Sequence, residues 1–161
     1  FYAIRVATRE VRLLGVTDHA NGAWTTTCCR NLTTFNDDFC RGATLDRDPI
    51  FTESMKACFR SIGCEVQVTP PHSPRCNAFI ERFIGTTRRD LGREIIPISG
   101  DFLEGCLRSH VEYYNRHRTH QALPGHRMPR PARDRFSKDD GEIVRHALIG
   151  ETLAFYTREV A

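Results

Sequence analysis

Short β-prone runs alternate with helix-like patterns along most of the chain. Residues 1–7 and 11–17 are two β-prone runs on either side of a polar break, which predicts a hairpin. Apolar residues at a helical spacing predict the helices, and Thr52 is a suitable N-cap for one of them. The expected elements after the hairpin are a helix at 23–35, strands at 42–45 and 65–69 around a helix at 53–62, and helices at 77–94 and 101–117. This order predicts an α/β domain with a mixed sheet flanked by helices.

Prolines divide the second half of the chain. Residues 70–74, Pro-Pro-His-Ser-Pro, can form neither a helix nor a central strand, so we expect a loop. Residues 119–135 contain three prolines and a glycine, which predicts an extended linker. Residues 141–160 are weakly apolar and could add a strand or a short helix. We therefore expect a core at 1–118, followed by a C-terminal linker and extension at 119–161.

Arginine dominates the basic residues, since only Lys56 and Lys138 are lysines among 23 basic side chains. The net charge is only +3, but residues 81–135 carry 11 basic and 7 acidic side chains and hold the positive excess. The planar guanidinium group makes forked contacts to phosphate, so this composition suits a protein that binds nucleic acid. A GC-rich genome also favours arginine codons, and composition alone fits both explanations.

The seven cysteines are odd in number and irregularly spaced, and no Cys-x-x-Cys pair occurs. This pattern favours neither a zinc site nor a disulfide framework, so we expect reduced and mostly buried thiols. The chain has no run of about 18 apolar residues, and its first residues lack the pattern of a signal peptide. These observations predict a cytoplasmic protein without a membrane span.

Two carboxylates stand at positions where functional side chains are common. Asp46 directly follows the strand expected at 42–45, and strand ends in α/β sheets often face an open crevice. Glu81 lies one turn into the helix that follows the proline-rich loop, and Asn77 shares its helix face because it lies four residues earlier. Thirty-four residues separate Asp46 from Glu81.

Three segments, in this order along the chain, resemble the catalytic core of DDE-type insertion-sequence transposases and retroviral-type integrases. Asp46 with Phe51-Thr52 is similar to the family's second catalytic Asp and the Phe-Thr pair that opens the next helix. Residues 69–82, TPPHSPRCNAFIER, resemble its Pro-Ser-Pro loop, its Asn, and its catalytic Glu four residues later. Residues 113–123, YYNRHRTHQAL, are similar to the Tyr-Asn, Arg-Pro-His, Ala-Leu signature after the core, with Thr119 in place of the usual Pro.

The resemblance covers about residues 40–123 and implies a ribonuclease H-like fold with two Mg²⁺ or Mn²⁺ ions held by three carboxylates. Asp46 would bridge the ions and Glu81 would complete one of them. Hard cations select oxygen ligands, and two of them could activate a water or a DNA 3′-hydroxyl for phosphoryl transfer. The resemblance also implies that Asn77, Arg88 and Arg89 contact double-stranded DNA, at transposon ends and target, and that the chain self-associates.

The family's first catalytic Asp lies on a strand ahead of the hairpin expected at 1–17. Asp18 follows that hairpin and matches no motif position. We therefore expect an N-terminally truncated fold without its first strand, and a 161-residue chain that cannot cleave DNA. The main hypothesis is a transposase or integrase core that cleaves DNA and transfers strands. The alternative is a non-catalytic DNA-binding or assembly remnant of a degraded transposase.

Several of these residues also have plainer interpretations. Asp48 could replace Asp46 as the metal ligand, or either could simply cap the following turn. Asn77 could be an N-cap, and Arg88 could belong to a solvated charged face. A structural role is favoured for the 113–123 signature, in which Tyr114, Asn115, Arg118 and His120 would fix the last helix against the core.

Overall fold

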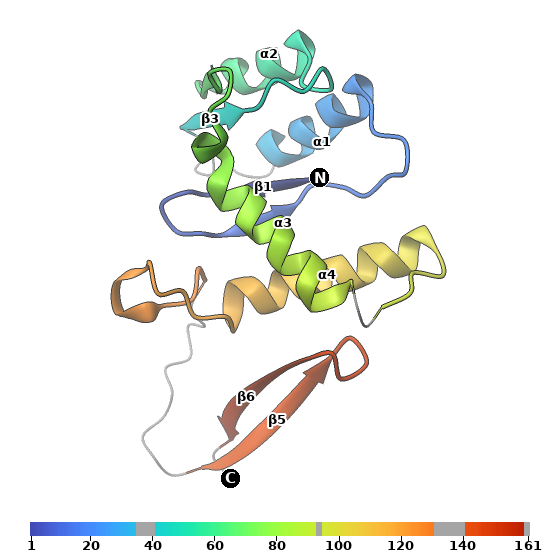
Figure 1. Ribbon diagram of the computed structural model, residues 1–161, viewed down its shortest axis with the longest axis vertical. Helices are drawn as coiled ribbons and strands as arrows, with labels where there is room; N and C mark the ends of the chain where they lie inside the picture. The colour runs from blue at the N-terminus through green and yellow to red at the C-terminus, as the bar shows by residue number, and fades with distance from the viewer. Residues whose placement is uncertain (35–40, 93–94, 131–140, 160–161) are drawn as a thin grey trace. The chain divides into compact units, whose positions relative to one another are not determined.

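The computed structural model describes residues 1–34, 41–92, 95–130 and 141–159. Its elements, shown in Figure 1, are β1 (Tyr2–Ile4), β2 (Val11–Leu13), α1 (Gly22–Thr34), β3 (Gly42–Leu45), α2 (Glu53–Ser61), β4 (Glu65–Val68), the 3-10 turn η1 (Pro74–Asn77), α3 (Ala78–Leu91), α4 (Gly100–Arg116), the 3-10 turn η2 (Pro124–His126), β5 (Glu142–Leu148) and β6 (Leu153–Glu159). The predicted mixture of helices and strands is confirmed.

Local signals set several element ends where the sequence predicts them. The N-cap of α2 is Thr52, whose side chain accepts a hydrogen bond from the Met55 backbone N–H at 3.3 Å. Gly63 follows the helix with a φ of +77°, a left-handed conformation that glycine adopts at low cost. Strand β3 has the predicted bounds. The residues at 35, 93 and 94, which the predicted helices include, lie outside the described part of the chain.

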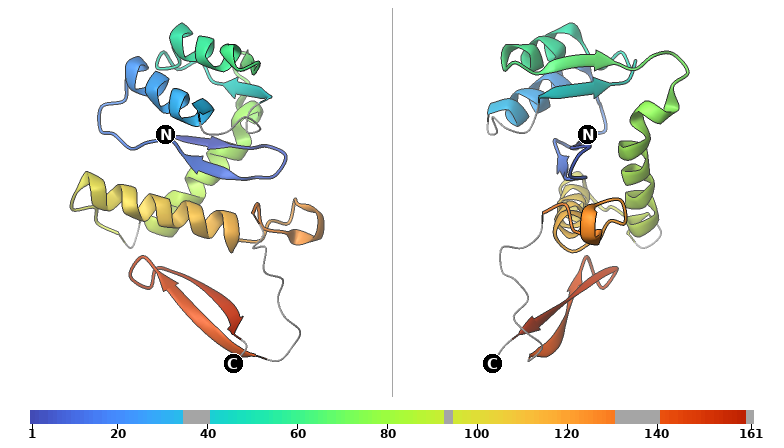
Figure 2. Two further views of the ribbon diagram at one scale, coloured as in Figure 1. Left: turned by 180° about the vertical axis from the view of Figure 1, so that it is seen from behind. Right: turned by 90° about the vertical axis from the view of Figure 1, so that its left-hand side faces the viewer.

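The residues group into two compact units. The first unit comprises Phe1–Ala3 and Leu13–Arg82. In it β3 and β4 pair in parallel, with Leu45 opposite Val68, and α1 packs against α2 (Figure 2). Its buried core joins side chains from α1, β3, α2 and the residue before β4: Cys29, Leu32, Leu45, Met55, Phe59 and Cys64. This core fixes the end of β3, where Asp46 follows.

The predicted single mixed sheet is not formed by the described residues. Their strands make three separate two-stranded sheets, β1–β2, β3–β4 and β5–β6. To join two of these sheets into one, an edge strand of one sheet would have to form hydrogen bonds with an edge strand of the other. None of the described strands does so. The α/β class is thus confirmed, while the ribonuclease H-like arrangement stays a prediction.

The second unit comprises Ile4–Arg12 and Phe83–Ala161. Phe83 of α3 is fully buried and contacts Tyr114 of α4 edge-on, with ring centroids 4.8 Å apart. Nearby, the Nε2 atom of buried His110 lies 3.2 Å from Asp90 Oδ2, and Arg118 donates to the same oxygen at 3.2 Å. Packing and hydrogen bonds therefore join this part of α3 to α4.

His110 makes the second unit sensitive to acid. Burial lowers the pKa of His110 below 6.5, and Asp90 only partly opposes this effect. The unfolded chain therefore takes up this proton first, and the contribution of neutral His110 to stability is lost as the pH falls below about 6.5. Burial also lowers the pKa values of His117 and His120, so their effect on stability has the same direction: stability is lost as the pH falls.

We expect the free energy of unfolding to fall between pH 7.5 and pH 5.5, by up to about 1.4 kcal/mol per pH unit for buried His110. The more exposed His117 and His120 should contribute less, because solvent screens them. Urea titrations at the two pH values measure the loss. His110→Gln should be less stable than the parent at pH 7.5 but should show a flatter pH dependence. An unchanged pH slope in this variant would contradict the assignment.

The C-terminal residues form a hairpin in which β5 pairs antiparallel with β6, with His146 opposite Phe155. The possibility of a strand in this region is thus confirmed. The Phe155 ring stacks on His117, at the end of α4, with centroids 3.6 Å apart, and on His146 with centroids 4.8 Å apart. The division between a core at 1–118 and an extension at 119–161 stays a prediction.

The cysteine prediction is only partly right. Cys28, Cys29, Cys58, Cys76 and Cys106 are free thiols, of which Cys28, Cys29 and Cys106 are buried. Cys64 is disulfide-bonded, contrary to the expectation of reduced thiols. Spacing rules detect cysteines that are close in sequence, whereas a disulfide needs only proximity in the fold. Among the helices that the structure describes, none has the length and apolar character to cross a membrane.

Candidate functional site

Asp46 is held at a fixed point directly after β3. Buried Leu45 anchors the end of the strand, and its carbonyl accepts a hydrogen bond from Thr69 N at 2.8 Å. The next residue, Arg47, donates from Nε to the Thr69 carbonyl at 3.0 Å. The exposed Asp46 therefore lies between two residues that are both hydrogen-bonded to Thr69, just after β4.

A pair of side-chain turns follows this strand end. Asp46 Oδ1 accepts a hydrogen bond from Asp48 N at 2.9 Å, and Asp48 Oδ1 accepts one from Ile50 N at 3.0 Å. Both carboxylates thus cap turns, as the plainer interpretation expects. A carboxylate has about four lone-pair sites, so one backbone hydrogen bond leaves Asp46 able to bind a cation.

Glu81 is presented by the start of α3. The loop before it includes His72 with a φ of +54°, and turns into η1 at Pro74. Asn77, the last residue of η1, is half-buried, and the chain continues without a break into α3. Glu81 is exposed in the first turn of α3, where a carboxylate is favoured by the helix dipole.

Asp46 and Glu81 come from neighbouring elements of the first unit, because η1 contacts β3. Neither Asp46 nor Glu81 takes part in the ion pairs found among the described residues. Two exposed, unpaired carboxylates are a suitable donor set for one hard cation. Within the described ranges, however, no three His, Cys, Asp or Glu side chains are grouped to hold a metal ion. That Asp46 and Glu81 share an ion stays a prediction.

The predicted DNA-contacting residues lie further along α3. Arg88 and Arg89 are exposed, and Arg89 also donates from Nη2 to Thr86 Oγ1 at 3.2 Å. Arg88 is seven residues from Glu81, so within this one helix the two side chains lie on nearly the same face. This placement is compatible with a phosphate contact and with a solvated face.

The 113–123 signature is engaged in structural contacts. Buried Asn115 accepts a hydrogen bond from Val11 N at 2.9 Å and donates one to Val11 O at 2.8 Å. Its side chain thereby pairs with β2 as a neighbouring strand would. Tyr114 packs against Phe83, and His120 contacts the Tyr114 ring edge-on with centroids 4.6 Å apart. These contacts support the structural interpretation of the signature.

Two acidic side chains that are not among the predicted site residues also form ion pairs in the second unit. Glu10 is only 6% exposed and forms ion pairs with Arg12 and Arg130. Asp90 joins His110 to Arg118. A buried acid in a short polar turn gives no periodic signal, because its burial depends on residues about a hundred positions away.

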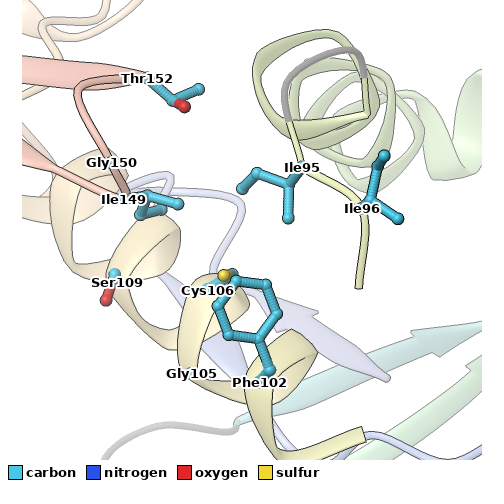
Figure 3. Close-up of a pocket in the computed structure, with 9 residues that line it drawn as sticks. All are labelled: Ile95, Ile96, Phe102, Gly105, Cys106, Ser109, Ile149, Gly150 and Thr152. Carbon is cyan, nitrogen blue, oxygen red and sulfur yellow. The ribbon is translucent and has the colours of Figure 1, made fainter. Parts of the chain in front are cut away.

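A separate pocket of about 580 Å³ lies in the second unit and is shown in Figure 3. Its lining is uncharged and mainly apolar: Ile95, Ile96, Phe102, Gly105, Cys106, Ser109, Ile149, Gly150 and Thr152. It includes neither Asp46 nor Glu81, and it offers no carboxylate for a metal ion and no cation for a phosphate.

Comparison with known proteins found one family model that matches part of the chain. Residues 62–129 match the family model described as "Integrase core domain". The matched segment contains β4, η1, α3 with Glu81, α4 and the 113–123 signature, while Asp46 lies ahead of it. No curated protein matches the chain.

Proposed function

We propose, from the match of residues 62–129 to the integrase core domain family model, that the chain acts on double-stranded DNA in recombination. The resemblance to DDE-type transposases and retroviral-type integrases is thereby confirmed. The proposed reaction is metal-dependent cleavage of a phosphodiester bond, followed by strand transfer. The observation that carries the proposal is the match itself, which includes Glu81 on a helix whose preceding turn contacts the strand that Asp46 follows.

Asp46 and Glu81 are the residues proposed to hold a divalent cation, Mg²⁺ or Mn²⁺. When bound, such ions polarise phosphate oxygens and activate a hydroxyl nucleophile. Asp46 is preorganised for this role because the end of β3 and the Asp48 N–H fix its position. Glu81 is oriented by the first turn of α3, and Asn77, Arg88 and Arg89 are proposed to position the DNA backbone.

We predict that Asp46→Asn and Glu81→Gln each weaken Mn²⁺ binding by about tenfold or more, because each removes one charged oxygen ligand. Electron paramagnetic resonance of free Mn²⁺ during titration measures the affinity without requiring activity. Asp18→Asn is the matched control, since Asp18 is also exposed but matches no motif position. Asp48→Asn tests the alternative ligand. Equal affinity in the parent, Asp46→Asn and Glu81→Gln would overturn the proposed site.

A second candidate function is a DNA-binding or assembly remnant that has lost the reaction. The observation that favours it is the lack, within the described residues, of a third side chain grouped with two others to hold a metal ion. A remnant would bind duplex DNA but bind Mn²⁺ no better than the Asp46→Asn variant. The same titration, run beside a DNA-binding assay, distinguishes the two functions.

A further inference from the structure

A concentration of positive charge lies in the second unit, away from Asp46 and Glu81 in sequence. It comes from two segments, the hairpin turn at 4–12 and the residues after α4 at 116–130. Together these segments contain seven arginines and one acidic residue, Glu10. We call six of these arginines the arginine face: Arg5, Arg9, Arg12, Arg118, Arg127 and Arg130.

Hydrogen bonds bring the two segments together. Asn115 forms its two hydrogen bonds with Val11, and the Asn115 carbonyl accepts a third from Arg130 N at 2.8 Å. Glu10 forms an ion pair with Arg130 across the same junction. Figures 1 and 2 show the hairpin turn and the segment around η2 near the same end of α4. The two segments therefore form one surface.

The arginines on this surface are close enough to affect one another. Burial lowers the pKa of Arg12 despite the opposing charge of Glu10, and the positive charges of Arg130 and Arg5 add to this effect. Burial also lowers the pKa of His120, which lies near the positive charges of Arg118 and Arg9. The one acidic residue of the two segments, Glu10, is 6% exposed and lies inside the surface. Glu10 pairs with Arg12 and Arg130, and Asp90 pairs with Arg118, but the six arginines still outnumber these two acids. The remaining like charges repel each other.

We propose that the arginine face binds the backbone phosphates of duplex DNA, as a contact surface additional to α3. Arginine offers a rigid, forked set of donors that matches phosphate oxygens, and the chain uses no lysine in these segments. An acidic polypeptide would also meet a positive surface. DNA is the better match because the same unit contains most of the integrase core match. The inference therefore rests on the proposed function.

The test compares two triple variants that lose the same charge. Arg5→Gln, Arg9→Gln and Arg127→Gln remove three charges from the face but leave Arg12 and Arg130 on Glu10 and Arg118 on Asp90. The control triple, Arg41→Gln, Arg60→Gln and Arg108→Gln, removes three exposed arginines elsewhere. Fluorescence anisotropy with a labelled 30-base-pair duplex of random sequence, measured over a range of salt concentrations, gives the affinity and its salt dependence. Circular dichroism checks that each variant is folded.

We expect the face triple to bind about tenfold or more weakly than the control triple, with a salt slope lower by about 2 to 3 because each lost phosphate contact removes about 0.9. Equal affinities and slopes in the two triples would overturn the inference, as would a parent chain that binds no duplex. Stronger displacement by a polyglutamate peptide than by unlabelled DNA would also overturn it. If the face triple loses duplex binding while it still binds Mn²⁺ at Asp46 and Glu81, both proposals are confirmed. Loss of DNA binding in Arg88→Gln but not in the face triple would reject the arginine face and leave the proposed function standing.

Discussion

Replacing Phe83 with alanine is expected to lower the free energy of unfolding by about 3 to 5 kcal/mol, the usual range for deleting a buried aromatic ring. Phe83 is 0% exposed, and its ring contacts Tyr114 edge-on and lies 5.7 Å from the His110 ring. Alanine would leave a cavity where α3 meets α4 and would remove both ring contacts. Urea or thermal unfolding followed by circular dichroism measures the loss.

Phe79→Ala is the matched control for this prediction. Phe79 lies one turn earlier on the same helix, but its side chain is 38% exposed. Its removal deletes the same atoms and changes the helix propensity in the same way, so it should cost clearly less than Phe83→Ala. Equal losses in the two variants would mean that Phe83 does not form a packed core with α4.

The elements of this protein were predictable where the signal is local. Thr52 caps α2 and Gly63 ends it through contacts within a few residues, and apolar residues at helical spacing marked α2 and α4. Such signals involve only residues that are close in sequence, so each segment shows them without its tertiary neighbours. The hairpin, the loop at 70–74 and the strand at 42–45 belong to the same class of prediction.

The pairing of distant segments was not predictable in the same way. The sequence indicates strands but not their partners, so the described strands form three small sheets instead of one mixed sheet. The disulfide at Cys64 and the ion pair between Glu10 and Arg130 likewise depend on proximity created by folding. Such contacts cannot be predicted from local patterns, because a short stretch of sequence does not indicate which distant residue will lie near it in the fold.

The candidate site falls between these two cases. The positions of Asp46 after a strand and of Glu81 in a first helical turn follow from local patterns, and both are observed. Whether the carboxylates converge on one ion depends on tertiary geometry, which is why metal binding is the deciding measurement. The arginine face was invisible at the sequence level, since its charges come from segments about a hundred residues apart.

Asn115 joins the two segments that form the arginine face. Its side-chain amide offers one acceptor and one donor, and both are used on the backbone of Val11. The amide therefore satisfies both backbone groups of a buried residue in β2. Alanine at this position would leave the Val11 N–H and C=O without these partners, and a buried unpaired polar group costs about 1 to 3 kcal/mol.

We therefore expect Asn115→Ala to lower the free energy of unfolding by about 2 to 4 kcal/mol, the sum of two such losses with some relaxation. Gln121→Ala is the control, because Gln121 is an exposed amide side chain of the same unit, and it should change stability by less than about 0.5 kcal/mol. Hydrogen exchange adds a local readout: the Val11 amide should exchange faster in Asn115→Ala, relative to amides in α2, than in the parent. Unchanged protection of the Val11 amide in this variant would show that Asn115 does not act as a substitute strand for β2, and the junction that forms the arginine face would then need another explanation.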